Sequence, residues 1–230
     1  MLIKTFPLTS FQQNTRIVVC EETKKAICID PATKSDVLVK FINDNGLELQ
    51  AITLTHGHLD HVGGTLDLQR SFPQVEIILH KDDEDLYYGL QQQPLRMGIP
   101  SFALKQLGFD YENPPKLTRN WQDGEVYEVG TLKFKVLHCP GHTRGHVVLA
   151  EENEKKVFVG DCLFEAGIGP TDLPGGAFEQ LIDSINRNIL TLGDDFTVYS
   201  GHGRETTGGH EKATNPYLTG VYQIGRGRFL

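Results

Sequence analysis

The chain has 230 residues and a mass of 25.7 kDa, which allows one large domain or two small ones. Hydrophobic residues make up 39% of it and charged residues 23%, which excludes a disordered chain and is ordinary for a soluble globular protein. The formal net charge of −8 describes a surface that repels phosphate backbones, so a nucleic acid is not an expected partner.

The sequence predicts neither a membrane span nor an export signal. No apolar run reaches the roughly 18 residues that a transmembrane helix needs. Residues 1–14 lack the apolar stretch of a secretory signal. The cysteines form no CxxC pair, so we expect reduced thiols at Cys20, Cys28, Cys139 and Cys162. These features predict a cytoplasmic protein without a membrane partner.

Short apolar runs alternate with helical patterns in the first third of the chain. A hairpin is expected around the turn EETKK, followed by a helix with Ser35 as its N-cap. The alternation of strand and helix that follows indicates a sheet with helices packed against it. The expected strands are 15–20, 26–30, 49–54 and 75–79, and the expected helices are 35–45 and 65–72.

Residues 81–120 interrupt this pattern. They contain two tyrosines at 87–88, three glutamines at 91–93 and several prolines, but few regular periods. We interpret the segment as a helical insertion or a long loop. Two roles have equal weight: a solvated excursion, or a flap over a site, since long loops in compact domains are often lids.

Alternating patterns return in the second half. Gly130 and Thr131 are expected to turn a hairpin over 125–136, and an amphipathic helix is expected over 178–192. The other expected strands are 147–150, 156–159 and 196–199. Two successive sets of strands, each followed by a helix, predict a layered sandwich with two sheets in the middle and helices outside. No linker interrupts it, so we predict a single domain over 1–230.

The nine histidines are gathered rather than scattered. His56, His58, Asp60 and His61 lie within six residues, directly after the apolar run LQAITL. His56 and His58 are two residues apart, so an extended backbone points both to the same side. Asp60 and His61 lie where the chain turns into the next helix and can point to a second position. Imidazole and carboxylate suit zinc, iron or manganese, so the segment predicts two metal positions rather than a polar turn.

Further candidates follow strands downstream. His142, Asp161 and His202 each come directly after an apolar run and beside a glycine, a position at which layered folds build sites. With the first cluster they make five histidines and two aspartates. Two metal ions need about that number of ligands if one carboxylate bridges them.

The other four histidines are expected to have ordinary roles. His80 ends a strand and is expected to cap a helix or to lie on the surface. His138 is expected behind the ligands, and His210 is expected in a loop near the end. His146 is the one competitor of His142 for its place.

Four motifs together resemble the metallo-β-lactamase superfamily: HGHLDH at 56–61, PGHTRGH at 140–146, GDCLF at 160–164 and SGHG at 200–203. The resemblance extends over nearly the whole chain. Within the superfamily the sequence looks most like the glyoxalase II group, the hydroxyacylglutathione hydrolases, on the evidence of LFEAGIGPTDLPGG at 163–176 and RETTGGHEKATNPYL at 204–218. The resemblance implies an α+β fold, a four-layer αββα sandwich of two mixed sheets flanked by helices.

The resemblance also implies two metal ions that share one aspartate. The ligands of the first ion would be His56, His58 and His142. Those of the second would be Asp60, His61 and His202. Asp161 would bridge the two ions. Zinc is the expected metal, and iron and manganese share these ligand types.

Two departures from the family concern the substrate. Glyoxalase II has a C-terminal helical domain that grips glutathione, and this chain is expected to lack it. Family members carry a basic residue after the glycine of the motif matched by GIGPTD, where it would contact a glutathione carboxylate, and here that position is Pro170. The candidate substitutes for this cation are Arg144, Lys105 and the tail residues Arg226 and Arg228.

The expected reaction is hydrolysis of a small molecule, such as a glutathione thioester. Two divalent ions lower the pKa of a shared water from about 16 toward 7, and the resulting hydroxide attacks a carbonyl carbon. Asp60 would orient this nucleophile and accept its proton. A thiolate leaves without an acid because thiol pKa values lie near about 8.5, which favours a thioester over an ester, lactone or lactam. Cys162 follows a strand and is expected to point into the core rather than to act as a nucleophile.

A mononuclear-iron persulfide dioxygenase is the main alternative. Such enzymes resemble the same family and use the residues equivalent to His56, His142 and Asp161. A nuclease and a metal-binding module without activity are less favoured, because the charge of −8 opposes the first and the complete set of candidate ligands opposes the second.

Overall fold

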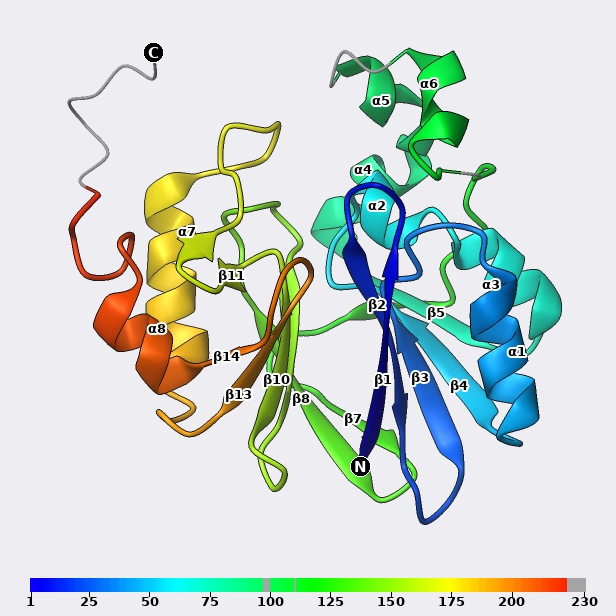
Figure 1. The fold of residues 1–230 in the computed structure, drawn as a ribbon, viewed down its shortest axis with the longest axis horizontal. Coiled ribbons are helices and arrows are strands. Elements are labelled where there is room, and N and C mark those ends of the chain that lie inside the picture. The colour runs from blue at the N-terminus through cyan, green and yellow to red at the C-terminus, as the bar shows by residue number, and fades with distance from the viewer. Residues whose placement is uncertain (97–99, 110, 223–230) are drawn as a thin grey trace.

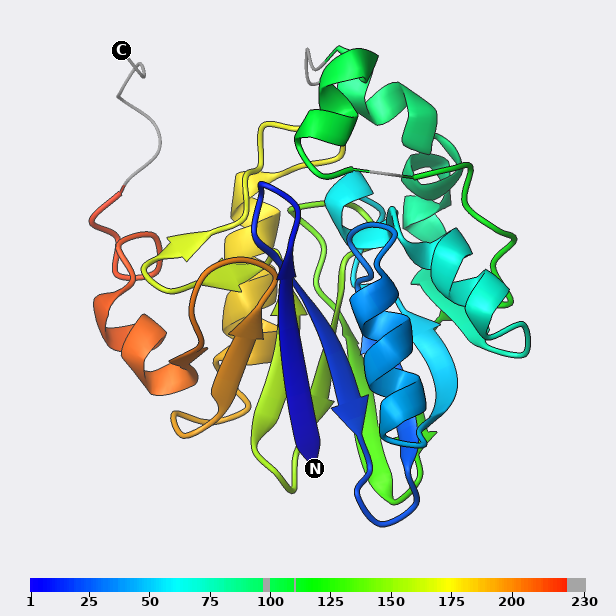
Figure 2. The same cartoon turned by 45° about the vertical axis from the view of Figure 1, so that its right-hand side comes forward.

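The computed structural model describes residues 1–96, 100–109 and 111–222 (Figure 1). Two six-stranded sheets lie face to face, and helices cover the outer face of each (Figures 1 and 2). This is the four-layer αββα sandwich of two mixed sheets that the sequence predicts. No helix in the described part of the chain is long and apolar enough to cross a membrane.

The first sheet has the strand order β1-β2-β3-β4-β5-β6. The first three strands pair antiparallel and the last four parallel, so the sheet is mixed. Helices α1 (Asp36–Asp44) and α3 (Thr65–Ser71) follow β3 and β4 and cover the outer face. The strands are β1 (Leu2–Leu8), β2 (Gln13–Val19), β3 (Lys25–Ile29), β4 (Glu48–Thr53), β5 (Glu76–His80) and β6 (Arg119–Trp121).

The second sheet has the order β14-β13-β10-β9-β8-β7. It is mixed because β10 and β13 are parallel while the other neighbours are antiparallel. Its strands are β7 (Val126–Val129), β8 (Leu132–His138), β9 (Val147–Glu151), β10 (Lys156–Gly160), β13 (Thr197–Ser200) and β14 (Thr206–Thr207). The helices on its outer side are α7 (Phe178–Ser184), its wider continuation η3 (Ile185–Ile189) and α8 (Gly208–Thr214). A small separate sheet pairs β11 (Leu163–Phe164) with β12 (Gly167–Ile168).

Successive side chains along a strand point to opposite faces of the sheet, so one strand contributes to two separate hydrophobic cores. In β3, Cys28 packs with Leu38 and Ile42 of α1, whereas Ile27 points to the second sheet and joins Phe134 of β8. All five side chains are buried. Burial of an aliphatic or aromatic side chain of this kind contributes roughly 1.5–3 kcal/mol, so residues on both faces of the strand hold the layers together.

The structure confirms the expected hairpin and its turn. Residues Gly130 and Thr131 join β7 to β8, and Gly130 has a φ of 61°, as a two-residue turn of this kind requires. Ser35 is the N-cap of α1, as predicted, although its side chain makes no capping hydrogen bond. The predicted helix over 178–192 corresponds to α7 and η3.

Some elements have too weak a pattern for the sequence to predict. β1 is an edge strand with Pro7 in it and no buried residue, so it lacks the apolar alternation of its neighbour. The loop expected around His210 is wrong, because this residue lies in α8. The helix begins at two glycines, which disfavour helix, and is capped by the Thr207 side chain, which accepts from His210 N.

The described residues of the segment 81–120 form several short helices and then an irregular stretch, 111–118, before β6. Its short helices are η1 (Lys81–Asp83), α4 (Glu84–Tyr88), η2 (Leu90–Gln92), α5 (Gln93–Arg96) and α6 (Ser101–Gln106), and β6 ends it. Tyr87 is buried in the core beneath α1 and α3, which ties the segment to the sandwich. In Figure 1, α5 and α6 rise above the first sheet, near the edge where the candidate ligands lie.

Candidate metal centre

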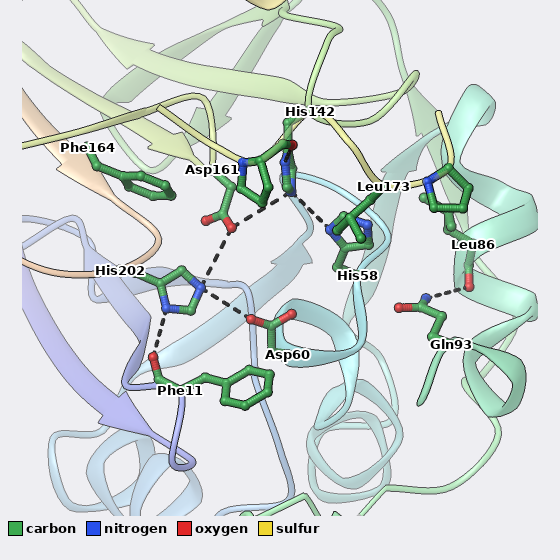
Figure 3. Close-up of a pocket in the computed structure, with 12 residues that line it drawn as sticks. Phe11, His58, Asp60, Leu86, Gln93, His142, Asp161, Phe164, Leu173 and His202 are labelled. Carbon is green, nitrogen blue, oxygen red and sulfur yellow. Dashed lines mark hydrogen bonds and ion pairs between the residues drawn. The ribbon is translucent and has the colours of Figure 1, made fainter. Parts of the chain in front are cut away.

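All seven residues predicted as ligands come together at one edge of the sandwich, where strands of both sheets end. Figure 3 shows five of them: His58, Asp60, His142, Asp161 and His202. His56 and His58 lie in the loop after β4, and the one-turn helix α2 (Leu59–Val62) follows them directly. The remaining positions are Asp60 and His61 in α2, His142 between β8 and β9, Asp161 after β10 and His202 after β13. Residues up to 146 positions apart thus share one small space because of the sheet topology.

One group consists of His56, His58 and His142. One nitrogen from each lies within 4.8 Å of those of the other two. The closest pair is His58 Nδ1 and His142 Nε2, 3.0 Å apart. The ring of His56 is fully buried, whereas that of His58 is only partly buried and reaches the surface of a pocket.

A second group consists of Asp60, His61 and His202, again with ligand atoms within 4.8 Å. His202 Nε2 lies 3.2 Å from Asp60 Oδ2, and His61 Nε2 lies 3.8 Å from the same oxygen. His61 is fully buried, while Asp60 and His202 are partly exposed toward the pocket.

The carboxylate of Asp161 lies between the two groups. Its Oδ2 atom is 3.8 Å from His142 Nε2 in the first group and 3.7 Å from His202 Nε2 in the second. Its Oδ1 atom is 3.3 Å from His61 Nε2. A single carboxylate therefore faces both groups.

Main-chain carbonyls determine which nitrogen of two rings faces the centre. His142 Nδ1 lies 2.8 Å from the carbonyl of Pro170, and His202 Nδ1 lies 2.9 Å from that of Phe11. A carbonyl only accepts, so Nδ1 of each ring carries the proton and the Nε2 lone pair faces the centre. Both rings are therefore oriented as metal ligands would be.

A carboxylate holds His61 in the same way. Asp30 Oδ2 lies 2.9 Å from His61 Nδ1 and also accepts from Thr55 Oγ1, at 2.7 Å. The other oxygen of Asp30 accepts from Thr55 N, at 2.8 Å. Asp30 is not among the site residues predicted from the sequence, and its one local signal is its position at the end of a buried strand.

His146 does not compete with His142. Its Nε2 accepts from the main-chain N–H of Asp161 at 3.1 Å, and its ring stacks on that of His56 at 4.8 Å between centroids. It lies behind the ligand groups and supports two of their members. Cys162 is buried, with Sγ 3.3 Å from His146 Nδ1, so it points into the core as predicted.

The charges of the centre suit a cation. Burial and the neighbouring His142 lower the pKa of His58 to about 3, so this ring is neutral. Burial alone would raise the pKa of Asp161, but the surrounding histidines, His61 above all, hold it well below its ordinary value. The centre thus holds a neutral imidazole at His58 and an ionised carboxylate at Asp161. Burial alone would lower the pKa of His61 and His202, but the carboxylates of the centre raise it because they attract positive charge.

Three buried polar atoms at the centre make no hydrogen bond within the described residues: His56 Nε2, His61 Nε2 and Asp161 Oδ1. Buried polar atoms in native proteins are almost always paired, so such a cluster needs an explanation. A metal ion is a partner for lone pairs of this kind. The donor set, imidazole nitrogens and carboxylate oxygens, fits zinc, iron or manganese.

Comparison with known proteins identifies the family. The family model of the metallo-β-lactamase superfamily matches residues 9–202. This chain belongs to the metallo-β-lactamase superfamily. The hydroxyacylglutathione hydrolase GloC of Haemophilus influenzae is 40% identical over 221 residues, which cover 95% of this chain and 98% of that protein.

Solved structures agree with this assignment. The crystal structure of the BLEG-1 B3 metallo-β-lactamase matches with a TM-score of 0.80 and 31% identity, over 95% of this chain and 100% of that one. The crystal structure of TTHA1623 in a di-iron-bound form matches with a TM-score of 0.77 and 35% identity, over 93% and 100%.

The loops that carry the ligands are fastened to each other by Asp83 of η1. This buried carboxylate accepts from Gly57 N at 2.9 Å, from Thr143 Oγ1 at 2.6 Å and from Gly145 N at 2.7 Å. Gly57 lies between His56 and His58, and Thr143 follows His142. One side chain thus connects the two loops that carry candidate ligands, and it is not among the site residues predicted from the sequence.

His80 and His138 lie outside the two ligand groups. His80 Nδ1 accepts from Asp82 N and so caps η1, as predicted. The ring of His138 stacks on that of His80 at 4.3 Å, and its Nε2 donates to the carbonyl of Arg144, at 2.8 Å. His138 therefore supports the His142 loop from behind.

A pocket of about 510 Å³ opens over the centre. Its floor consists of proposed ligands, and two residues of the 81–120 segment, Leu86 and Gln93, contribute to its wall. The position of these two residues favours a flap over a site, rather than a solvated excursion, as the role of the segment 81–120. Arg144 and Lys105 are not among the described lining residues, and Arg226 and Arg228 lie outside the described chain.

Proposed function

We propose that this chain is a metal-dependent hydrolase that cleaves thioesters at a dinuclear centre. The observation that carries the proposal is the position of Asp161, whose carboxylate lies within 3.8 Å of imidazoles from both ligand groups. The name of the Haemophilus influenzae relative, a hydroxyacylglutathione hydrolase, supports the thioester as the substrate class.

The residues present fit two divalent ions. His56, His58 and His142 would hold one ion, and Asp60, His61 and His202 the other. Asp161 would be shared between them. When bound, the ions would supply a hydroxide at neutral pH and polarise the scissile carbonyl. Zinc is proposed, and the di-iron-bound form of TTHA1623 makes iron the metal to test beside it.

Asp60 is the proposed proton acceptor. Its carboxylate lies at the pocket floor and is oriented by His202, whose Nε2 is 3.2 Å from Oδ2. Burial would raise the pKa of Asp60, but His61 and His202 bring it below its ordinary value, so the group is ionised. An ionised carboxylate within hydrogen-bond reach of a nucleophile can hold and orient its proton.

The pocket favours a leaving group that needs no proton. Among the described lining residues, the groups that can carry a titratable proton are Asp60, Asp161 and three histidines, and all five belong to the proposed ligand set. None of these lining residues is a lysine or a tyrosine that could act as a general acid. A thiolate leaves without such help because the pKa of a thiol is about 8.5.

The test measures metal content and thioester hydrolysis in the same preparations. Asp161→Ala and His58→Ala should each lower bound metal and reduce kcat/KM by at least about 100-fold. Full activity of either variant after chelation and dialysis would contradict the site assignment.

The dioxygenase alternative has its own discriminating variant. His202→Ala removes a ligand of the second group only and should abolish thioester hydrolysis. If the variant instead retains one iron and consumes oxygen with a persulfide, the centre is a mononuclear-iron oxygenase. An enzyme with two zinc ions and thioester turnover would exclude that outcome.

A further inference from the structure

We propose that the substrate carries an apolar, uncharged acyl group beside the scissile carbonyl. This inference rests on the proposed thioester hydrolysis and adds the class of thioester. It comes from the walls of the pocket over the metal centre rather than from the ligands themselves.

The described lining of the pocket divides into three parts. Five of its twelve residues are proposed metal ligands, and one is Gln93. The other six are apolar: Phe11, Leu86, Phe164, Pro170, Leu173 and Pro174. In Figure 3 the two phenylalanines lie on the side of His202, and Leu86 and Leu173 lie on the side of His58, so apolar walls flank the centre on both sides.

Gln93 is engaged by main-chain groups at both ends of its amide. Nε2 donates to the carbonyls of Gly57 and Leu86, at 2.8 and 2.9 Å, and Oε1 accepts from Leu59 N, at 2.8 Å. The side chain is only 6% exposed. It therefore braces α4 against the ligand loop and offers the substrate little polar recognition.

Pro170 also presents an apolar surface. Its nitrogen has no hydrogen to donate, and its carbonyl is taken by His142 Nδ1 at 2.8 Å. The residue at this position thus contributes a ring to the pocket where the resemblance leads one to expect a cation for a glutathione carboxylate.

The apolar walls are attached to the centre. The ring of Phe11 packs edge-on against Phe109, with centroids 5.1 Å apart, while its carbonyl holds His202. The ring of Phe164 lies edge-on to His202, at 6.2 Å. On the other side, Leu86 packs closely over the loop that carries His56 and His58. A Cβ added to Gly57 in this loop would lie 2.8 Å from the Cβ of Leu86.

These walls favour apolar groups over charged ones. Methylene groups that lie against apolar side chains are removed from water, which makes the binding free energy more favourable. A carboxylate or ammonium in the same position would lose its hydration without gaining a partner. The acyl group is therefore expected to be aliphatic or aromatic rather than hydroxylated or charged.

The experiment crosses two acyl groups with two thiols. S-Hexanoyl and S-lactoyl thioesters of N-acetylcysteamine and of glutathione are hydrolysed by the metal-loaded enzyme. We expect the hexanoyl group to raise kcat/KM by at least about tenfold over lactoyl on both thiols. We expect glutathione to give no more than about a threefold advantage over N-acetylcysteamine.

Two variants connect the preference to the walls. Leu173→Asn should reduce the ratio of hexanoyl to lactoyl kcat/KM by about fivefold, mainly through KM. Phe11→Ser removes one of the two phenylalanine rings of the opposite wall, at the tip of the β1–β2 hairpin, and should reduce the same ratio. Leu95→Asn is the matched control, because Leu95 is 69% exposed and is not among the described lining residues of this pocket.

The outcomes separate this inference from the proposed function. A lactoyl preference, or a glutathione advantage above about tenfold, overturns the apolar assignment while thioester hydrolysis stands. An unchanged ratio in both wall variants also overturns it. If a preparation with two bound metal ions hydrolyses none of the four thioesters, the proposed function itself fails.

Discussion

His61 Nδ1 lies 2.9 Å from Asp30 Oδ2, and both side chains are buried. This carboxylate fixes the ring so that Nε2 faces Asp60 and Asp161, and it accepts two hydrogen bonds from Thr55 as well. Asp30 thus connects the end of β3 to the second ligand group without belonging to it.

Asp30→Asn should weaken metal binding at the second group. The amide keeps the size of the side chain but places a donor among groups that need an acceptor. Loss of such an outer carboxylate typically costs 10–100-fold in metal affinity. Competition with a chelator measures the effect, and Asp44→Asn, an exposed change in α1, is the control. Equal affinities in the two variants would contradict the role given to Asp30.

Asp83→Asn should loosen the connection between the two ligand loops. The amide cannot accept from Gly57, Thr143 and Gly145 together, so at least one buried donor loses its partner. We expect the free energy of unfolding to fall by about 1–3 kcal/mol. Urea denaturation measures this free energy. Asp82→Asn is the control, because Asp82 is the exposed neighbour of Asp83 in the chain. If the two variants are equally stable, Asp83 does not hold the loops together.

Gly201→Ala should displace the shared carboxylate. A Cβ at this position would lie 2.2 Å from Asp161 Oδ1 and 2.8 Å from His61 Cε1, and both neighbours are buried. Displacement of a reacting geometry by about 1 Å can cost about 100-fold in rate. We expect that loss of hydrolysis together with lower metal content. Gly167→Ala is the control because its Cβ would meet nothing closer than 3.7 Å.

His80 gives a pH-dependent contribution to stability. Burial and the stacked His138 lower the pKa of His80 below its ordinary value of 6.5. Below that pH the unfolded chain binds a proton that the folded chain does not, so the folded state is destabilised as the pH falls.

His80→Asn tests this contribution. Asparagine keeps an acceptor for the N–H of Asp82 but does not titrate. The difference in unfolding free energy between wild type and variant should be constant from about pH 7 to 8. As the pH falls below about 6.5, the wild type should lose more of its unfolding free energy than the variant. Urea unfolding across this range measures it. Parallel curves down to pH 5 would show that His80 titrates normally.

The sequence predicts the proposed ligands better than the residues that support them. His56 and His58 stand out because ligand types repeat at extended spacing directly after an apolar strand, and both lie at the centre as expected. Asp30 and Asp83 do not stand out, because their partners are distant along the chain. Asp30 meets His61 31 residues away, and Asp83 meets Thr143 60 residues away.

The same distinction holds for the fold. Strands buried on both faces, such as β3, show continuous apolar runs and are predictable from local pattern. β1 is stabilised by its pairing with β2, and α8 depends on a cap from Thr207 and on the buried Glu211, which accepts from Thr206 Oγ1. Their stability comes from partners that a local pattern does not show.

Phe11 and Pro170 each act twice, once through the main chain and once through the side chain. Their carbonyls orient His202 and His142, while their rings form part of the pocket. A point substitution at either position changes the ring and leaves the carbonyl in place. Single substitutions at these positions can therefore alter the lining of the pocket while the two histidines keep their orientation, whereas an insertion or deletion in either loop would displace the carbonyl that orients them.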